Sequence, residues 1–382
     1  MREPEDELAT LHQEGLLRSL RSGLSSDQLL STSDGLPVVN FSSNDYLGLS
    51  RDEALVTAAC EATGRYGTGA GASRLLSGSL LPHRDLEERI AEWKGTEAAL
   101  TFANGYATAM GALGAFLTSG DVVIMDKLCH ACLIDGARRS GATLRIFPHN
   151  NLDKLENLLG HYRKKISENS RLLVVTESVF SMDGDRAPLA EIVDLVEKYH
   201  ALLLLDEAHA VGILGSGGQG LAEELGLQDR IALQMGTLGK AVGSAGGYLA
   251  ASRAWINLLT NKARPFIYST APPPAQAAAS LCGIDIIASS RGVELRDRLW
   301  SNISRLSELL GKQPASAIIP VILGDNEMAL RASATLLEKG YLAPAIRFPT
   351  VPRGSARLRI TLSAEHQEEA IVGLHQNLLN VS

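Results

Sequence analysis

The sequence predicts an α/β fold: a large domain built on a mostly parallel β-sheet, and a smaller α+β C-terminal domain. Between about residues 95 and 251, short and continuously apolar segments alternate with segments of helical pattern, which is typical of a parallel sheet covered on both faces. A proline-rich break follows at residues 270–276. Beyond this break the alternation changes, with longer helical segments and separate strands, which indicates a second domain.

Each predicted element has its own signal in the sequence. Leucines at helical spacing predict an amphipathic helix over residues 4–22, and residues 36–41 read as a strand. Apolar segments predict the strands of the large domain at residues 97–102, 121–126, 171–178, 201–209, 231–237 and 246–251. Helical patterns between these strands lie at residues 107–117, 133–141 and 189–200. The C-terminal part is expected to contain helices at about 275–312 and 328–340, and strands at 316–324 and 357–363.

Length and charge limit the class of protein. The chain has 382 residues, enough for two or three domains. We expect an N-terminal helical arm and strand over residues 1–45, the large domain over 46–285 and the small domain over 286–382. The net charge of −7 argues against a nucleic-acid-binding protein, which usually carries a basic excess.

The sequence also bears on the compartment. Its longest weakly polar segment, residues 106–117, is shorter than the roughly 20 residues needed to cross a bilayer. The acidic N-terminus lacks the basic and apolar regions of a signal peptide. Four cysteines are too few for a disulfide scaffold and fit a reducing compartment. We therefore expect a cytoplasmic protein without a membrane segment.

Candidate site residues follow the predicted strands, because ligands in open α/β sheets bind at the carboxyl ends of the strands. Lys240 lies between two glycine-rich segments, where a flat ligand has room and the amine can form a Schiff base. A surface lysine in a flexible loop would give the same pattern. Asp206 follows a run of apolar residues and is either a strand-end cap or a buried acid beside a cofactor ring. His209 lies three residues further on.

Other groups after the strands could complete such a site. Gly105 and Tyr106 stand at the start of a predicted helix, where backbone N–H groups favour a phosphate. His130 follows the strand at 121–126 and is either a ring-stacking group or a helix cap. Ser181 and Thr237 could contribute hydroxyl groups that bind a cofactor.

Three other motifs are present only in part. Residues 206–209 read DEAH, as in helicase-type ATPases, but the chain has no phosphate loop of the form GxxxxGK[ST]. Cys129 and Cys132 lack the second cysteine pair of a structural zinc site. The glycine-rich segment 67–78 follows a helical pattern, whereas a dinucleotide fingerprint follows a strand. We therefore predict no metal site and no ATPase.

Taken together, several motifs in the same order resemble the α-oxoamine synthases, which depend on pyridoxal 5'-phosphate (PLP) and belong to the fold-type I aminotransferase superfamily. The segments that carry the resemblance are residues 40–50, 67–78, 179–192, 206–220, 237–247, 267–277 and 349–366. They extend over nearly the whole chain. The resemblance implies the aminotransferase-like fold and a PLP cofactor.

The resemblance also implies cofactor roles for single residues. Lys240 would hold PLP covalently and later remove the α-proton of the amino acid, and Asp206 would pair with the pyridine nitrogen. His130 would stack on the ring and stabilise charge at the thioester oxygen. The phenolic oxygen side of the ring would contact His209 and Ser181. The phosphate and ring would be surrounded by Gly105, Tyr106 and Thr237.

Substrate contacts are implied in the same way. Arg359 would bind the carboxylate of the amino acid, and Asn44 would lie near the substrate. Arg18 and Thr350 would contact the acyl substrate, as His130 would.

Within the family, the chain most resembles the members that condense L-alanine with pimeloyl-CoA or a pimeloyl carrier protein in biotin biosynthesis, with loss of carbon dioxide. Glycine C-acetyltransferase shares the cofactor residues and is the alternative; 5-aminolevulinate synthase and serine palmitoyltransferase fit less well. The segments 67–78 and 349–363 favour the pimeloyl enzymes. The family implies a homodimer with active sites at the subunit interface.

Overall fold

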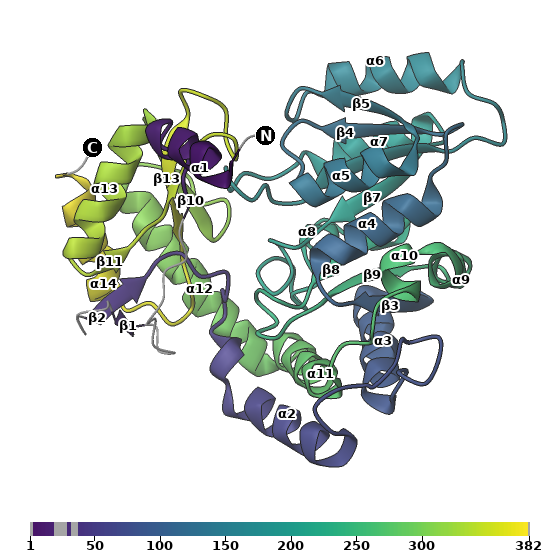
Figure 1. Cartoon of the computed structure of the whole chain (residues 1–382), viewed down its shortest axis with the longest axis horizontal. Coiled ribbons are helices and arrows are strands. Elements are labelled where there is room, and N and C mark those ends of the chain that lie inside the picture. The colour runs from purple at the N-terminus through teal and green to yellow at the C-terminus, as the bar shows by residue number, and fades with distance from the viewer. Residues whose placement is uncertain (1–2, 19–28, 32–36, 381–382) are drawn as a thin grey trace. The chain divides into compact units, whose positions relative to one another are not determined.

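The computed structural model describes residues 3–18, 29–31 and 37–380 (Figure 1). The chain forms two compact units. The large unit comprises residues 45–181 and 185–297, and the small unit comprises residues 1–44, 182–184 and 298–382. The predicted boundary after residue 285 would fall inside helix α11 (Pro274–Ala288), and the predicted division into domains stays a prediction.

A seven-stranded sheet forms the centre of the large unit. Its strands are β3 (Ala98–Phe102), β4 (Val122–Asp126), β5 (Thr143–Phe147), β6 (Leu172–Glu177), β7 (Leu202–Asp206), β8 (Leu233–Thr237) and β9 (Gly247–Ala251). They are arranged in the order β3-β9-β8-β7-β6-β4-β5. Strand β9 is antiparallel to both neighbours, and the other adjacent pairs are parallel. The predicted α/β fold class is confirmed.

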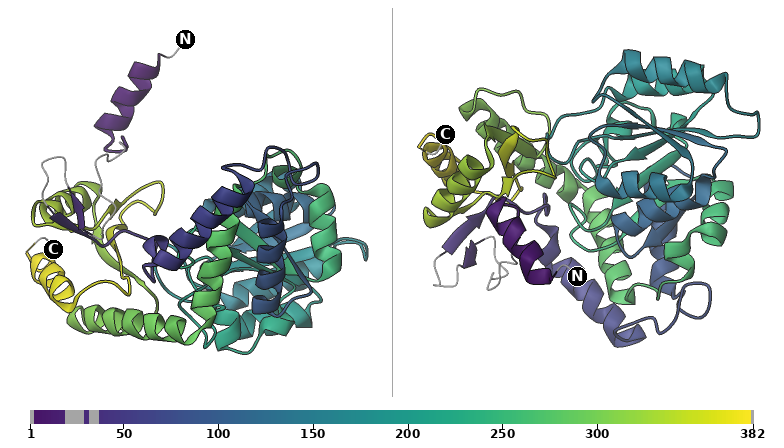
Figure 2. Two further views of the ribbon diagram at one scale, coloured as in Figure 1. Left: turned by 90° about the horizontal axis from the view of Figure 1, so that it is seen from below. Right: turned by 45° about the horizontal axis from the view of Figure 1, so that its top comes forward.

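Four helices cover one face of this sheet: α4 (Gly105–Phe116), α5 (Ala131–Ser140), α9 (Arg253–Lys262) and α10 (Arg264–Ile267). Their apolar side chains form one buried core with alternate residues of the strands, among them Leu173, Val175 and Leu204. Helices α4 and α5 lie side by side (Figures 1 and 2). A Cβ on Gly136 would lie 2.9 Å from Leu113 Cδ1, so the absence of a side chain there lets α5 approach α4.

Further helices complete the large unit. Helices α6 (Leu152–Arg163) and α7 (Leu189–Lys198) pack on each other and on the central strands. Helix α11 packs between α2 (Glu53–Tyr66) and α3 (Leu81–Lys94). Helix α3 contacts the edge strand β3 and its neighbour β9. Short elements are η1 (Leu49–Arg51), α8 (Leu221–Glu224) and η2 (Gln228–Arg230).

The small unit contains two three-stranded sheets. One is antiparallel and consists of β10 (Ile318–Gly324), β13 (Ala356–Thr361) and β12 (Ala345–Ile346), with Pro320 opposite Arg359. The other consists of β1 (Leu29–Ser31), β2 (Pro37–Asn40) and β11 (Tyr341–Leu342). Its helices are α1 (Pro4–Gln13), α13 (Asn326–Glu338) and α14 (Glu368–Leu378). Helix α12 (Ser290–Leu309) begins in the large unit and ends in the small one.

Two predicted helices differ from the structure. The helix predicted over residues 4–22 ends at Gln13, and residues 19–22 lie outside the described residues. The helix predicted over 275–312 is two helices, α11 and α12. Ser289 separates them because its backbone is extended and its hydroxyl donates to the carbonyl of Ile286, which ends α11.

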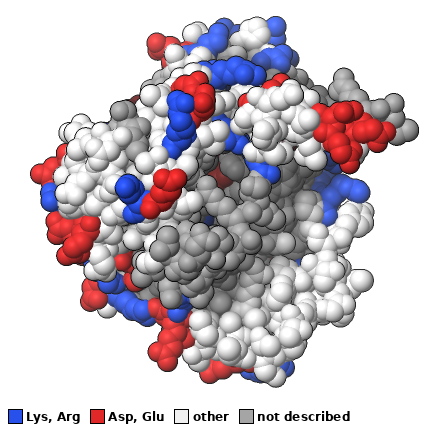
Figure 3. Space-filling view, turned by 60° about the vertical axis from the view of Figure 1, so that its left-hand side comes forward, with Lys and Arg blue, Asp and Glu red and all other residues white. Residues whose placement is uncertain are grey.

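The surface carries charges of both signs. On the face shown in Figure 3, acidic and basic side chains are interspersed among uncharged residues.

Within the described part of the chain, no helix has both the length and the apolarity needed to cross a bilayer.

Candidate active site

The carboxyl ends of five strands meet at one edge of the large sheet. Strands β3, β4, β6, β7 and β8 run in the same direction, because β9 is antiparallel to both β3 and β8. Eight of the predicted site residues lie at or just beyond these strand ends: Gly105, Tyr106, His130, Ser181, Asp206, His209, Thr237 and Lys240. All eight belong to the large unit. The side chain of Ser181 is buried there.

Lys240 lies in the turn after β8 and contacts an imidazole. Its Nζ is 2.7 Å from His209 Nε2, and His209 Nδ1 is 2.6 Å from the hydroxyl of Tyr46. When Lys240 is an ammonium, it donates to Nε2; the imidazole proton then resides on Nδ1 and is donated to Tyr46. Tyr46 is fully buried and was not predicted. Its only sequence signal is its place in the segment 40–50.

The turn after Lys240 depends on a glycine. Gly243 has φ +76° and donates its N–H to the carbonyl of Lys240. A Cβ at this position would lie 2.5 Å from the carbonyl carbon of Leu49. A side chain would therefore displace the turn that holds the lysine.

Two buried carboxyl groups stand side by side at the ends of β6 and β7. Glu177 is opposite Asp206 in the parallel register, and both are buried. Burial raises the pKa of Asp206, while the Lys240 charge and the N–H of Ala208, which donates to Oδ1 at 2.9 Å, act in the opposite direction. Burial and the charge of Asp206 raise the pKa of Glu177 well above its usual range. The pair therefore favours a cation next to Asp206.

His130 caps the N-terminus of α5. Its Nδ1 accepts the N–H of Cys132 at 3.3 Å and lies 2.9 Å from the Cys132 thiol. Its own backbone N–H donates to Oε1 of Glu177. Desolvation lowers the pKa of His130, against the raising effect of the Asp206 charge.

The start of α4 presents backbone N–H groups that could bind an anion. Asn104 caps this helix by accepting the N–H of Ala107 at 2.8 Å, and the first turn leaves backbone N–H groups without intrahelical partners. Thr237 lies next to Gly105, since a Cβ on Gly105 would be 3.9 Å from the Thr237 side chain. Gly247 also lies close to Gly105, because a Cβ added to Gly247 would be 2.7 Å from the Gly105 nitrogen. The site suits a phosphate group.

Tyr106 is anchored by its hydroxyl. The residue is about half exposed (48%), and its hydroxyl donates to Asp135 Oδ2 at 2.7 Å. The contribution of Tyr106 to an anion site is therefore its backbone N–H.

The remaining predicted residues belong to the small unit. Arg359 is buried in β13, with Nη2 3.2 Å from Asn44 Oδ1 and Nη1 3.0 Å from Thr361 Oγ1. The structure thus brings Asn44 and Arg359 together. The side chain two residues earlier, Arg357, pairs with Asp183 at 2.6 Å.

Arg18 and Thr350 line a cavity of about 610 Å³ in the small unit. Its walls are mostly apolar, and a second arginine lines it, Arg347, which was not predicted. Burial and the nearby charge of Arg18 lower the pKa of Arg347. Among the residues that the structure describes, no carboxylate pairs with either guanidinium. Two arginines among apolar side chains suit an anionic group on an aliphatic chain.

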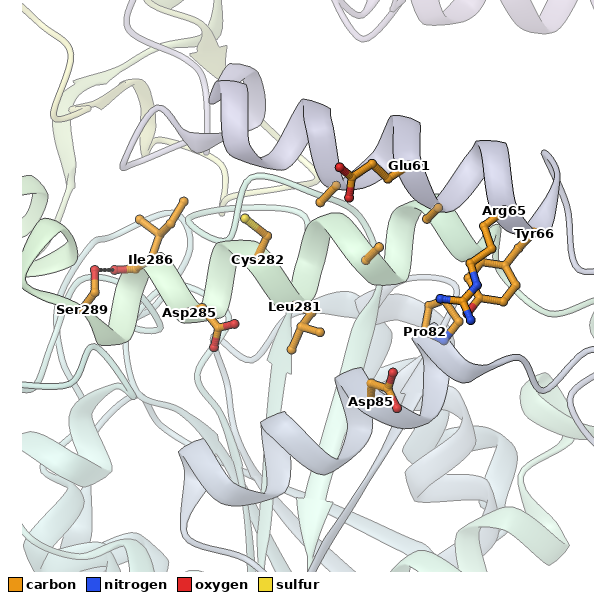
Figure 4. A pocket seen from close by; sticks show the side chains of 13 residues that line it. Glu61, Arg65, Tyr66, Pro82, Asp85, Leu281, Cys282, Asp285, Ile286 and Ser289 are labelled. Atoms are coloured by element: carbon orange, nitrogen blue, oxygen red, sulfur yellow. Dashed lines mark hydrogen bonds between the residues drawn. The ribbon is translucent and has the colours of Figure 1, made fainter.

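A second cavity, of about 600 Å³, lies between α2 and α11 in the large unit (Figure 4). Glu61 and Arg65 come from α2, and Cys282 and Asp285 come from α11. None of the predicted site residues lines it. We therefore do not assign the active site to this cavity, although it is large.

A sequence profile of the family "Aminotransferase class I and II" matches residues 37–376. The chain belongs to this family. Curated relatives named 8-amino-7-oxononanoate synthase include one from Geobacter sulfurreducens, 45% identical over 95% of this chain and 93% of the relative. Another, from Symbiobacterium thermophilum, is 44% identical over 95% of this chain and 93% of the relative. The predicted resemblance to the α-oxoamine synthases is confirmed.

Solved structures show the same fold. A serine palmitoyltransferase from S. paucimobilis with a bound PLP–myriocin adduct has a TM-score of 0.91 and 29% identity, covering 99% of this chain and 97% of that chain. An 8-amino-7-oxononanoate synthase from Francisella tularensis has a TM-score of 0.76 and 25% identity, covering 90% of this chain and 97% of that chain.

Proposed function

We propose that this chain is a PLP-dependent enzyme of biotin biosynthesis. It would join L-alanine to a pimeloyl thioester and release 8-amino-7-oxononanoate, carbon dioxide and the free thiol. The observation that carries the proposal is the contact between Lys240 and His209 at the sheet edge that also holds Asp206. The names of the curated relatives support the choice of reaction.

The residues at this edge fit PLP by their chemistry. The amine suits the aldehyde of the cofactor, and the buried acid suits its pyridine nitrogen. A hydroxyl and the N-terminus of α4 together suit its phosphate. Lys240 would hold the aldehyde carbon, Asp206 the pyridine nitrogen, and Gly105, Tyr106 and Thr237 the phosphate. His209 and Ser181 would contact the phenolic oxygen, and His130 the ring face. When bound, PLP supplies a sink for the electrons of a carbanion at the α-carbon of the amino acid.

The chain's own groups would then move protons and hold charges. Lys240 Nζ takes the α-proton of alanine, and the imidazole of His209, which accepts from Nζ, orients the amine. Burial raises the pKa of Asp206, and the positive charge of a protonated pyridine nitrogen would keep the carboxylate ionised. Arg359, oriented by Asn44 and Thr361, binds the carboxylate of the amino acid until carbon dioxide leaves.

The cavity of the small unit favours a pimeloyl donor. A pimeloyl chain has an aliphatic body and a carboxylate at its far end, which match the apolar walls and the two arginines, Arg18 and Arg347. An acetyl group has neither feature. This cavity therefore favours the pimeloyl enzyme over glycine C-acetyltransferase.

We also propose that the chain is a cytoplasmic homodimer. Leu75, Leu76 and Tyr268 are 50%, 82% and 71% exposed, and a β-bridge between Ser73 and Thr270 brings their two segments together. Clustered exposed apolar side chains mark an interaction surface, and a second copy of the chain would cover it. Light scattering should give twice the chain mass, and a monomer in solution would contradict this proposal.

The reaction is tested by supplying the purified, PLP-loaded protein with two pairs of substrates. We expect free thiol and 8-amino-7-oxononanoate from alanine and pimeloyl-CoA. Turnover of glycine with acetyl-CoA at a higher kcat/KM would instead establish the alternative. A pimeloyl carrier protein tested in parallel decides the form of the donor. The same protein without substrate should absorb visible light, with a shift on addition of alanine.

A further inference from the structure

His130 is an unusual helix cap. It precedes α5 with φ −55° and ψ 145°, and its Nδ1 accepts the N–H of Cys132, the second residue of the helix. Caps are usually serine, threonine, aspartate or asparagine, whose side-chain oxygens always offer a lone pair. An imidazole nitrogen can accept only when it carries no proton.

The N–H of Cys132 therefore determines the tautomer. A backbone N–H can only donate, and it lies 3.3 Å from Nδ1. The lone pair must then be on Nδ1 and the ring proton on Nε2. The Cys132 thiol, 2.9 Å from the same Nδ1, adds a second donor. This thiol is buried, and burial raises its pKa, so it keeps its proton.

The charges around the ring come from three other elements as well as α5. Asp206 at the end of β7 favours an imidazolium, as does Asp135 in α5, whereas Lys240 after β8 opposes it. Glu177 at the end of β6 accepts the backbone N–H of His130 and so fixes the main chain. The positive end of the α5 dipole also disfavours a charged ring at this position.

Protonation of Nδ1 would break the cap. It would place a ring N–H against the N–H and the S–H of Cys132 and leave the first turn of α5 without its acceptor. The Nε2–H, in contrast, has no hydrogen-bond partner among the residues that the structure describes. It can therefore donate to a bound ligand without loss of the cap.

We propose that Cys132 is a positioning residue that holds His130 as the neutral Nε2–H tautomer, so that His130 acts as a hydrogen-bond donor and not as a base. The identity of the acceptor, the oxygen of the thioester carbonyl as it gains charge, rests on the proposed function. The tautomer does not depend on that function. Hydrogen bonds already oriented toward developing charge are an effective form of catalysis.

The tautomer can be read directly from the protein with ¹⁵N-labelled histidine, loaded with PLP. Two-bond ¹H–¹⁵N spectra show which ring nitrogen carries the proton, and His130→Gln assigns the signal. We expect the proton on Nε2 and a bare Nδ1 at pH 7. A proton on Nδ1, or an imidazolium at pH 7, would overturn the proposal.

Variants of the thiol test the part played by Cys132. Cys132→Ala removes one donor and should raise the pKa of His130 and lower kcat about three- to tenfold, which corresponds to one hydrogen bond, with little change in KM for alanine. Cys132→Ser keeps a donor and should stay within about twofold of wild type in kcat. Cys129→Ala is the matched control, because Cys129 is buried nearby but its thiol points to the Val175 carbonyl at 3.6 Å.

Failure of the positioning role of Cys132 and failure of the proposed function give different results. Equal His130 pKa values in wild type and Cys132→Ala would overturn the positioning role. If Cys132→Ala does not fold, the wild-type tautomer and the behaviour of Cys132→Ser still decide the question. A wild-type protein with the Nε2–H tautomer but no turnover of alanine and pimeloyl-CoA would count against the proposed function alone.

Discussion

At the level of single residues, the hydroxyl of Tyr46 determines how His209 meets Lys240. It lies 2.6 Å from Nδ1 in a fully buried position. In Tyr46→Phe, Nδ1 loses this partner, and an unsatisfied buried group costs roughly 1–3 kcal/mol. We expect PLP to remain covalently attached, with kcat about tenfold lower and an altered visible spectrum. A Tyr46→Phe protein with unchanged spectrum and kcat would contradict the role of this hydrogen bond.

Arg347 is the residue with which we test the choice of acyl donor. Arg347→Met removes a guanidinium from the cavity wall. The kcat/KM for pimeloyl-CoA should fall about 10- to 100-fold, because a charge-assisted hydrogen bond contributes roughly 1.5–3 kcal/mol. With heptanoyl-CoA, which lacks the far carboxylate, the change should be less than about threefold.

Arg353→Met is the matched control for Arg347→Met, since Arg353 is in the same loop, is exposed and stacks on Phe348 outside the cavity lining. It should leave both donors unaffected. Equal losses for pimeloyl-CoA and heptanoyl-CoA in Arg347→Met would instead point to the phosphates of CoA as the bound anion.

At the level of elements, the position of α4 against β9 should control phosphate binding. In Gly247→Ala the new Cβ would lie 2.5 Å from Thr108 Oγ1 and 2.7 Å from the Gly105 nitrogen. Overpacking of this kind costs roughly 1–3 kcal/mol and must displace the helix start. The Kd for PLP should therefore rise about tenfold, as measured by fluorescence titration.

Gly114→Ala, in α4 itself, provides the control for Gly247→Ala. A Cβ on Gly114 meets nothing within 4 Å, and alanine favours a helix over glycine. We expect an unchanged Kd for PLP and a slightly higher melting temperature. A Gly247→Ala protein that binds PLP as wild type does would show that this contact does not position α4.

The loop after β5 gives a pH-dependent contribution to stability. Burial alone would lower the pKa of His149, but hydrogen bonds to Asp126 and Asp185 raise it to about 10. Since the folded pKa lies above the unfolded value of about 6.5, the stabilisation is complete below that pH and is lost as pH rises toward 10.

This pH dependence can be measured by denaturant unfolding. Between pH 6.5 and pH 10, the free energy of unfolding should fall less in His149→Gln than in wild type. His161→Gln, which changes an exposed histidine in α6, should behave as wild type does. The same pH dependence in all three proteins would contradict the assignment of this effect to His149.

At the level of the whole molecule, the sequence patterns predict six of the seven strands of the large sheet and miss the edge strand β5. Buried strands such as β6 and β7 each begin with four consecutive apolar residues, a pattern typical of parallel strands buried on both faces. Strand β5 was not predicted, because it lies at the sheet edge and its residues, among them Arg145, are partly exposed.

Contacts between distant residues explain what the sequence does not reveal about the site. Lys240, Asp206 and His209 follow strands or glycine-rich turns, so their positions in the pattern indicated them. Tyr46 is 163 residues from His209, and no local pattern connects the two. Cys132 was noticed only as a possible metal ligand, because its contact with His130 depends on the first turn of α5.

The covalent attachment of PLP to Lys240 is the central claim. Borohydride reduction of the PLP-loaded protein, followed by peptide mass mapping, tests it most directly. We predict a single pyridoxyl group on the peptide that contains Lys240, and none after reduction of Lys240→Ala. A pyridoxyl group on another lysine, or an adduct that survives in Lys240→Ala, would contradict the account.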